Sequence, residues 1–187
     1  MEKIGLRLIV VFLILFLIIL FIYPLLSILF ITMILFTLFF FREPRRVVED
    51  GIVAPSDGKI IYVDDKRLEI FMGLLDCHVS ISPCDGVVER VEQLGGSFLP
   101  AFREKKNVRN IIFIRNEDGL FRVELVAGFL ARRILCYVRT GERIKKGQKI
   151  GMIVFGSKTV LEIPEKYRFV RKKGEKVKAG ETVAVKK

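Results

Sequence analysis

Cysteine and histidine are scarce in this sequence of 187 residues, which contains three cysteines and one histidine. The odd number of cysteines, Cys77, Cys84 and Cys136, does not supply the paired framework of a disulfide-rich secreted domain and is compatible with a reducing cytoplasm. A zinc site made from Cys77, His78 and Cys84 would need a ligand spacing that these residues do not have. We therefore expect free thiols and no metal site.

Amphipathic helices of convincing length are missing after residue 42, as are coiled-coil heptads and any motif for binding nucleic acid. Short runs of β-branched and aromatic residues alternate there with turns rich in glycine, proline and aspartate. Strands are expected over residues 52–54, 59–63, 68–72, 86–91, 110–114, 120–126 and 150–154, with a hairpin turn at 118–119. Residues 128–138 are compatible with a strand or a helix. The pattern predicts a mainly β domain, folded as a compact sandwich or barrel.

Charge is absent from one long stretch, Leu8 to Phe41, in which 34 consecutive residues are rich in Leu, Ile and Phe. About 20 apolar residues span a bilayer, so the stretch is too long for the core of a signal peptide, and it lacks a small-residue cleavage site. Pro24 near its middle is compatible with one kinked helix or with a helical hairpin. Positive residues at both ends favour the hairpin. We expect residues 1–41 to form a transmembrane or re-entrant anchor in the cell membrane, and residues 42–187 to form a soluble domain facing the cytoplasm.

Positive charge dominates the second part of the chain. The net charge is +11, of which residues 1–41 carry +1 through Lys3 and Arg7 against Glu2, leaving +10 for residues 42–187. A basic domain beside an apolar anchor indicates attraction to anionic lipid headgroups. Nucleic acid is the other usual partner of a basic domain, but the motif for it is missing. We expect a membrane and a lipid as partners, and no nucleic acid.

One stretch of the sequence is repeated. Residues 141–150 are echoed by residues 174–183, each copy with two glycine turns around a β-branched residue. Two copies suit a quasi-symmetric β-hammerhead of the barrel-sandwich type, as in biotinyl- and lipoyl-type domains. Residues 155–158, Phe-Gly-Ser-Lys, lie between the copies and are expected near an exposed hairpin tip, where such folds present a reactive group.

Several short motifs occur in a specific order around this tip. They are Phe39–Arg46, Val53–Gly58, Asp76–Val79, Pro83–Gly86, Asn107–Asn110, Gly128–Ile134 and Phe155–Ser157. Together with the apolar N-terminal segment, they resemble the short-form phosphatidylserine decarboxylase family, which includes the archaetidylserine decarboxylases. The resemblance covers most of the chain.

The resemblance implies a pyruvoyl-dependent decarboxylase that is made as a proenzyme. Cleavage between Gly156 and Ser157 would give chains 1–156 and 157–187, which stay associated, and would convert Ser157 into the pyruvoyl cofactor. The enzyme would form a Schiff base with a serine-headgroup phospholipid and release CO2 and the ethanolamine lipid. Whether that anionic aminophospholipid is archaetidylserine or phosphatidylserine stays open, as does assembly into a homo-oligomer.

Other residues receive roles through the same motifs. Serine needs a base, and His78 is the only histidine. Asp57 would orient His78 and complete a serine-histidine-aspartate arrangement. Arg132 and Arg133 are candidates for binding the lipid phosphate, because arginine suits bidentate phosphate contacts. The motif that begins at residue 107 adds a last pair of candidate substrate contacts, Asn107 and Arg109.

Two alternatives to an enzyme remain from the residues alone. A biotinyl- or lipoyl-type carrier would be modified at Lys158, although the methionine neighbours expected beside such a lysine are absent. A non-enzymatic membrane adaptor built on a similar fold would be expected to contain long coiled-coil heptads, which the sequence lacks.

Overall fold

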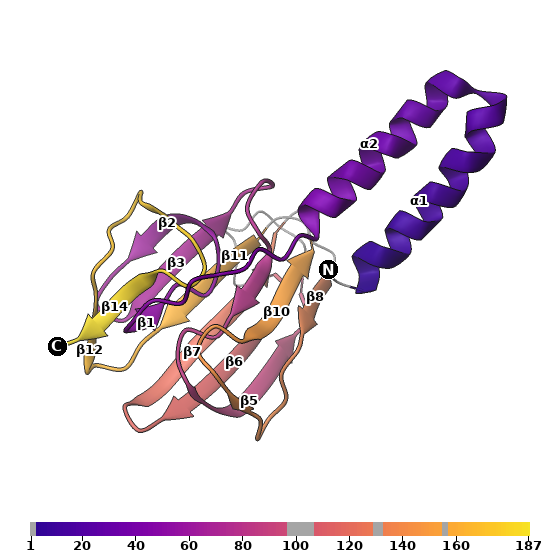
Figure 1. Cartoon of the computed structure of the whole chain (residues 1–187). Helices are drawn as coiled ribbons and strands as arrows, with labels where there is room; N and C mark the ends of the chain where they lie inside the picture. Colours follow the sequence, from indigo (N-terminus) through magenta and orange to yellow (C-terminus); the bar gives the residue numbers. More distant parts are fainter. Residues whose placement is uncertain (1–2, 97–106, 129–132, 155–156) are drawn as a thin grey trace. The chain divides into compact units, whose positions relative to one another are not determined.

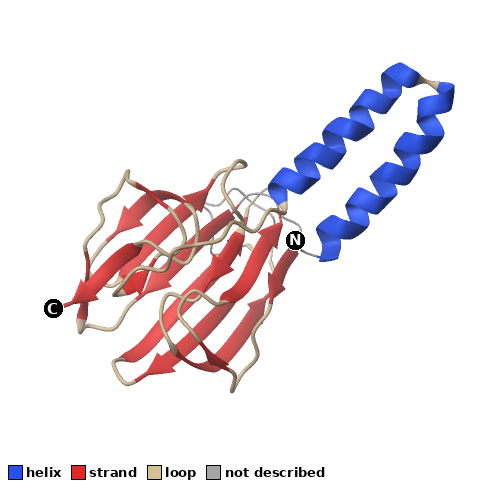
Figure 2. Ribbon diagram, viewed as in Figure 1, coloured by secondary structure: helices blue, strands red, loops and turns tan. Residues whose placement is uncertain are grey.

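The computed structural model describes residues 3–96, 107–128, 133–154 and 157–187, and the chain divides into two units, Met1–Pro44 and Arg45–Lys187 (Figure 1). The first unit consists of helices α1 (Lys3–Ile22) and α2 (Pro24–Phe40), which pack against each other as an antiparallel pair (Figure 2). Pro24 lies in the first turn of α2, where a missing N–H leaves no hydrogen bond unmade. The proline thus ends one helix and begins the next.

Both helices carry apolar side chains all around their surfaces. Ile18 and Leu35, for example, are 55% and 60% exposed. The hydroxyls of Thr32 and Thr37 donate to main-chain carbonyls one turn earlier, at 2.9 and 2.7 Å, so their polar atoms are satisfied inside the helix. Within the described residues, neither helix combines the length and the apolarity needed to cross a bilayer.

The second unit is built from antiparallel strands, which confirms the prediction of a mainly β domain. Its strands are β1 (Ile52–Val53), β2 (Gly58–Val63), β3 (Arg67–Met72), β4 (Val79–Ile81), β5 (Gly86–Leu94), β6 (Arg109–Asn116), β7 (Gly119–Ala127), β8 (Arg133–Cys136), β9 (Arg143–Ile144), β10 (Lys149–Val154), β11 (Ser157–Glu162), β12 (Tyr167–Phe169), β13 (Lys176–Val177) and β14 (Thr182–Lys186). Each expected strand is present, and the ambiguous residues 128–138 contain β8. Strands β9 and β13 and the start of β14 lie in the two repeated stretches, whereas β4, β11 and β12 were not expected.

The strands form one large sheet and two small ones. The eight-stranded sheet has the order β13-β2-β3-β11-β7-β6-β5-β9, and the three-stranded sheets have the orders β1-β14-β12 and β4-β10-β8. The strand order of the large sheet is symmetric about its centre. Counted inward from the two edges, β13 corresponds to β9, β2 to β5, β3 to β6 and β11 to β7. The small sheets match each other in the same way. In one of them Ile52 lies opposite Ala184, and in the other Ser80 lies opposite Gly151. The domain is therefore an internal duplication.

Matched turns support this duplication. Asp57 and Asp85 each follow a proline by two residues and precede a glycine, and each accepts a main-chain N–H through Oδ1, from Ala179 at 2.8 Å and from Lys146 at 2.9 Å. The turn glycines of the two sequence copies have φ of 86° and 83° in the first and 97° and 99° in the second. Any other residue would be strained there.

The two halves of the duplication are nested. The second half, β4 to β10, is inserted between β3 and β11 of the first half. The chain returns to the first half between Val154 and Ser157. The prediction of a hairpin tip at this place is wrong, because the described strands β10 and β11 belong to different sheets and do not pair with each other.

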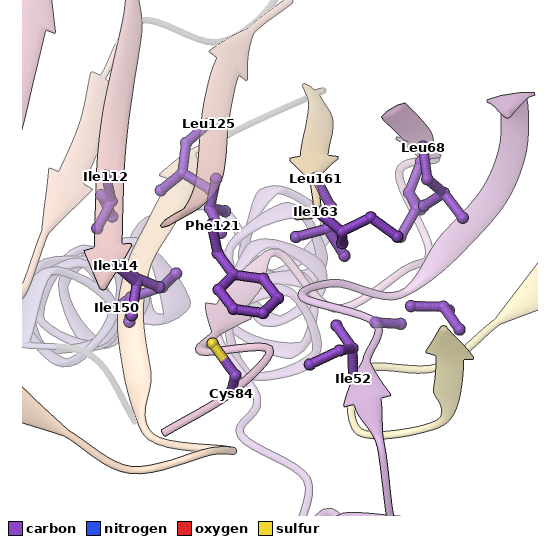
Figure 3. Packing of buried hydrophobic residues seen from close by; sticks show 14 of the residues in the cluster. Ile52, Leu68, Cys84, Ile112, Ile114, Phe121, Leu125, Ile150, Leu161 and Ile163 are labelled. Atoms are coloured by element: carbon purple, nitrogen blue, oxygen red, sulfur yellow. The ribbon is translucent and has the colours of Figure 1, made fainter. Parts of the chain in front are cut away.

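Apolar side chains of both halves meet in one core. Ile52, Leu68 and Leu161 come from the first half, and Phe121 and Ile150 come from the second (Figure 3). Burial of each of these side chains contributes about 1.5–3 kcal/mol. The core therefore holds the beginning, middle and end of the β domain together.

Candidate active site

Ser157 is the first residue of β11, a central strand of the large sheet. It lies opposite Met72 at the end of β3 and opposite Ala127 at the end of β7. Both neighbours are fully buried. Gly156, the other partner in the predicted cleavage, lies outside the described residues, as does Arg132. The main chain at Ser157 is thus held on both sides by hydrogen-bonded strands.

His78 is fully buried and directly precedes the short strand β4. Its Nδ1 lies 2.9 Å from the main-chain oxygen of Asp76. A carbonyl only accepts, so Nδ1 carries the hydrogen, and the neutral tautomer that this contact selects has its lone pair on Nε2. This is the form in which an imidazole can take up a proton.

A main-chain hydrogen bond ties His78 to β10, the strand that precedes Ser157 in the chain. The carbonyl of His78 accepts from the N–H of Ile153 in β10 at 3.2 Å. Ile153 precedes Ser157 by four residues, and Met72, which lies opposite Ser157, precedes His78 by six. The fold therefore brings the candidate nucleophile and the candidate base to the same end of β10.

Asp57 lies in the turn before β2, at the same end of the large sheet. Its Oδ1 accepts from Ala179 N, and its Oδ2 lies 2.5 Å from Nη2 of Arg46. Gly58, the next residue, has no room for a side chain, because a Cβ there would lie 2.2 Å from the carbonyl oxygen of Phe71. The described contacts give Asp57 and His78 different partners. An orienting role of Asp57 toward His78 stays a prediction.

Two contributions to this region were missed by sequence reasoning. Arg46 was noted as part of the first family motif and as a positive flank of the apolar segment, without a role at the site, yet it binds the carboxylate of Asp57. The carbonyl of Asp76 orients His78, and a main-chain group leaves no signal in the sequence. Because Arg46 shortly precedes the motif that contains Asp57, it could have been proposed as the ion-pair partner of this aspartate.

Lys158 does not present its amine to solvent. The residue is 3% exposed, and its Nζ lies 2.8 Å from Oε2 of Glu69 on the neighbouring strand. A carrier lysine must be reached by a modifying enzyme, so this burial removes the observation that favoured a carrier domain.

The Lys158–Glu69 pair begins a chain of alternating charges across four strands. Arg67 joins Glu69 to Glu162, with nitrogen–oxygen distances of 2.8 and 3.2 Å. The chain continues through Arg122 and Glu124 to Arg109, which lies 3.9 Å from Glu124. Arg109, a predicted substrate contact, therefore takes part in a protein ion pair.

The other predicted substrate contacts differ in exposure. Asn107 is 1% exposed, and its Nδ2 donates to the carbonyl of Ala127 at 2.9 Å. Ala127 is the residue that lies opposite Ser157 on β7. Arg133 is exposed on β8, opposite Val154 at the end of β10. The described residues contain no group of three or more side chains suited to holding a metal ion.

Comparison with known proteins adds a family to this geometry. The model of the family described as phosphatidylserine decarboxylase matches residues 33–185. A protein of Archaeoglobus fulgidus, provisionally named an archaetidylserine decarboxylase proenzyme, is 56% identical over 151 residues, which cover 80% of this chain and 77% of that protein. The phosphatidylserine decarboxylase proenzyme of Syntrophus aciditrophicus is 38% identical over 165 residues, covering 79% and 78% of the two chains.

Proposed function

Because the chain belongs to the phosphatidylserine decarboxylase family, we propose that it converts a phospholipid with a serine headgroup, archaetidylserine or phosphatidylserine, into the ethanolamine lipid and CO2. The family consists of pyruvoyl-dependent lyases that are made as proenzymes. The observation that carries the proposal is the position of Ser157. It lies at the start of a central strand and follows β10, the strand to which buried His78 is hydrogen-bonded.

The proenzyme would cleave itself between Gly156 and Ser157, where the chain passes from β10 to β11. The hydroxyl of Ser157 would add to the carbonyl carbon of Gly156 while His78 Nε2 accepts the hydroxyl proton, so that the peptide bond shifts to an ester. Elimination would then release residues 1–156 with a free carboxylate, and hydrolysis of the resulting dehydroalanine would give the pyruvoyl group and ammonia. The lone pair on Nε2 that follows from the Asp76 contact supports this role of His78.

The surroundings of Ser157 fit a cofactor at the new chain end. The pyruvoyl group supplies an electron sink for the pair released with CO2. Strands β3 and β7 hold the main chain on both sides of the residue, and the side chains that lie opposite it, Met72 and Ala127, are fully buried. The Lys158–Glu69 pair holds the next residue in the central strand.

We place the lipid phosphate next to Arg133, because this exposed guanidinium lies opposite the end of β10. Arg132 keeps the same proposed role. Asn107 and Arg109 would act from the side of the site, and their contacts with Ala127 and Glu124 suit a supporting position. Asp57 would stabilise the turn that borders the site and orient His78 during the reaction.

Residues 1–41 would hold the enzyme at the membrane as a re-entrant hairpin, with residues 42–187 on the cytoplasmic side. The apolar surface of both helices supports this arrangement. Helix α2 has 17 residues, or roughly 26 Å at the usual rise, which is short of the hydrocarbon thickness of a bilayer. A hairpin that enters and returns on the same side needs no full crossing.

Intact-mass analysis of the purified protein tests the proposal. We expect two chains, 1–156 and 157–187, with the smaller one lighter by one ammonia than a peptide that begins with serine. Ser157→Ala should stay full length. Ser82→Ala is the matched control, because Ala54 occupies the corresponding turn of the other half, and this variant should still be cleaved.

A single, uncleaved wild-type chain would overturn the proposal, and so would cleavage of Ser157→Ala at the same bond. Decarboxylation assays with the ether and the ester serine lipid then identify the preferred substrate.

A further inference from the structure

We propose that the loop tip formed by Leu74 and Leu75, together with a row of lysines beside it, docks the β domain on an anionic bilayer and presents the Ser157 end to the headgroups. This inference rests on the proposed function, since it concerns how a bilayer lipid reaches that site. The two leucine side chains are 47% and 70% exposed.

Gly73 and Asp76, the residues on either side of the two leucines, hold the tip in shape. The N–H of Gly73 donates to Oδ2 of Asp76 at 2.8 Å, and the N–H of Asp76 donates to the Gly73 carbonyl at 3.1 Å. The closed turn presents both leucines without further ordering of the main chain. Insertion of such a preformed tip has a low entropic cost.

The tip borders the candidate active site. Met72, which lies opposite Ser157, precedes Leu74 by two residues, and His78 follows Leu75 by three. A lipid that reaches Ser157 with its headgroup must keep its chains in an apolar environment close by. Leucines at the rim meet the bilayer where such a lipid would leave it.

A cationic row adjoins the tip on the large sheet. Phe71, 43% exposed, lies opposite Lys59 of β2, and Lys59 lies opposite Lys176 of β13. Directly opposite residues of antiparallel strands share a face, so the two lysines repel each other. Within the described residues, Glu69 compensates Lys158 of this row, and no ion pair includes Lys59 or Lys176. An anionic surface would relieve this repulsion.

The internal duplication supplies a comparison within the same molecule. The turn between β6 and β7, Glu117-Asp118, occupies the place in the second half where the chain leaves β3 in the first half. At the turn between β6 and β7, the carboxylate of Asp118 is paired with Lys166 and Lys186. The Ser157 end of the large sheet differs, because it combines two exposed leucines with lysines that have no carboxylate partner among the described ion pairs.

The sequence contains no tryptophan, so a single introduced one reports its own surroundings. We expect the emission of full-length Leu75→Trp to shift to the blue on reconstitution into vesicles with anionic lipid, and to be quenched by lipids with brominated chains. The matched control is Leu120→Trp. Leu120 lies beside the Glu117-Asp118 turn and is 37% exposed, and its tryptophan variant should show neither effect. Equal responses of the two variants would overturn the proposal.

Charge reversal tests the lysine row separately. A lysine near an anionic surface contributes about fivefold to binding, so Lys59→Glu should raise KM for vesicle-borne substrate about fivefold or more and leave kcat on a monomeric short-chain substrate unchanged. Arg143→Glu, in the strand that corresponds to that of Lys176, is the control and should leave both constants unchanged. Unchanged KM in Lys59→Glu contradicts the inference.

Intact mass separates this inference from the proposed function. If the wild-type chain is cleaved and active but Leu75→Trp does not sense lipid, the docking surface is wrong and the decarboxylase assignment stands. If the wild-type chain is neither cleaved nor active, the assignment itself fails.

Discussion

His78 is oriented by a main-chain carbonyl, and this contact determines which of its nitrogens can act as a base. The hydrogen on Nδ1 points to the Asp76 carbonyl, and Asp76 also closes the leucine turn through its carboxylate. One residue thus shapes both the loop tip and the imidazole. The carboxylate of Asp57, which would be the obvious orienting group, is bound by Arg46 and by Ala179 N.

Lys158 offers a test of ionic interactions at the residue scale. In Lys158→Met, Glu69 would keep Arg67 but lose a partner that is 4% exposed, so we expect the free energy of unfolding to fall by about 1–3 kcal/mol. The thermal midpoint in detergent should drop by several degrees. The measurement uses the Ser157→Ala proenzyme, in which the chain stays in one piece.

The exposed pair Lys66–Glu165 supplies the control for this experiment. Its two side chains are 65% and 79% exposed and lie 2.6 Å apart, and surface pairs of this kind contribute little to stability because water and salt screen them. Lys66→Met should therefore leave the midpoint almost unchanged. Equal effects of the two substitutions would mean that burial does not strengthen the Lys158 pair.

At the scale of elements, Asp118 in the β6–β7 turn connects the large sheet to a small one. Its Oδ2 accepts from Tyr167 Oη of β12 at 2.6 Å, and its Oδ1 lies 2.9 Å from Lys186 Nζ of β14. These two hydrogen bonds lower the pKa of Asp118, and the one from Tyr167 has the larger effect. Burial raises the pKa of Tyr167 and keeps the phenol protonated as the donor.

The sign of this shift predicts a pH dependence. A carboxyl group with a lower pKa in the folded state stabilises the fold above its ordinary pKa, and this contribution is lost as the pH falls through the folded value. Asp118→Asn should lower the thermal midpoint at pH 7 and should flatten its decline below about pH 4. Asp65→Asn, in the β2–β3 turn, is the control. Parallel midpoint curves for Asp118→Asn and the unmodified chain would contradict the prediction.

At the scale of the whole molecule, nesting explains how a cleaved chain can remain one domain. Residues 157–187 contain β11, between β3 and β7, and β14, between β1 and β12. They also bury Leu161, Val183 and Ala184 completely. The proposed cleavage cuts one of the two connections between the halves without removing a strand from any of the three sheets.

We therefore expect the two proposed chains to stay together after cleavage. Size-exclusion chromatography in mild detergent should give one peak that contains both chains, and only a denaturant should separate them. Elution of residues 157–187 as a free peptide under native conditions would contradict the prediction. The uncleaved Ser157→Ala variant, with the same elution volume, is the reference.

The sequence by itself determined the features that depend on neighbours along the chain. Alternating apolar residues and turn signals predicted most strands, because a half-buried strand has a period of two wherever it lies in a fold. The repeated glycine turns were visible because left-handed φ restricts the residue type locally. The proposal that Ser157 is the processing residue rests on the order of the family motifs.

Only the tertiary structure decided how these elements combine. Lys158 and Glu69 are 89 residues apart, and Asp57 and Ala179 are 122 residues apart. Burial of Lys158, the partners of Asp57 and the nesting of the halves all depend on such contacts, which no local pattern encodes. The short strand β4 is buried on both faces, so it has no alternation to reveal it. Placement of Leu74 and Leu75 beside Ser157 likewise required the pairing of β3 with β11.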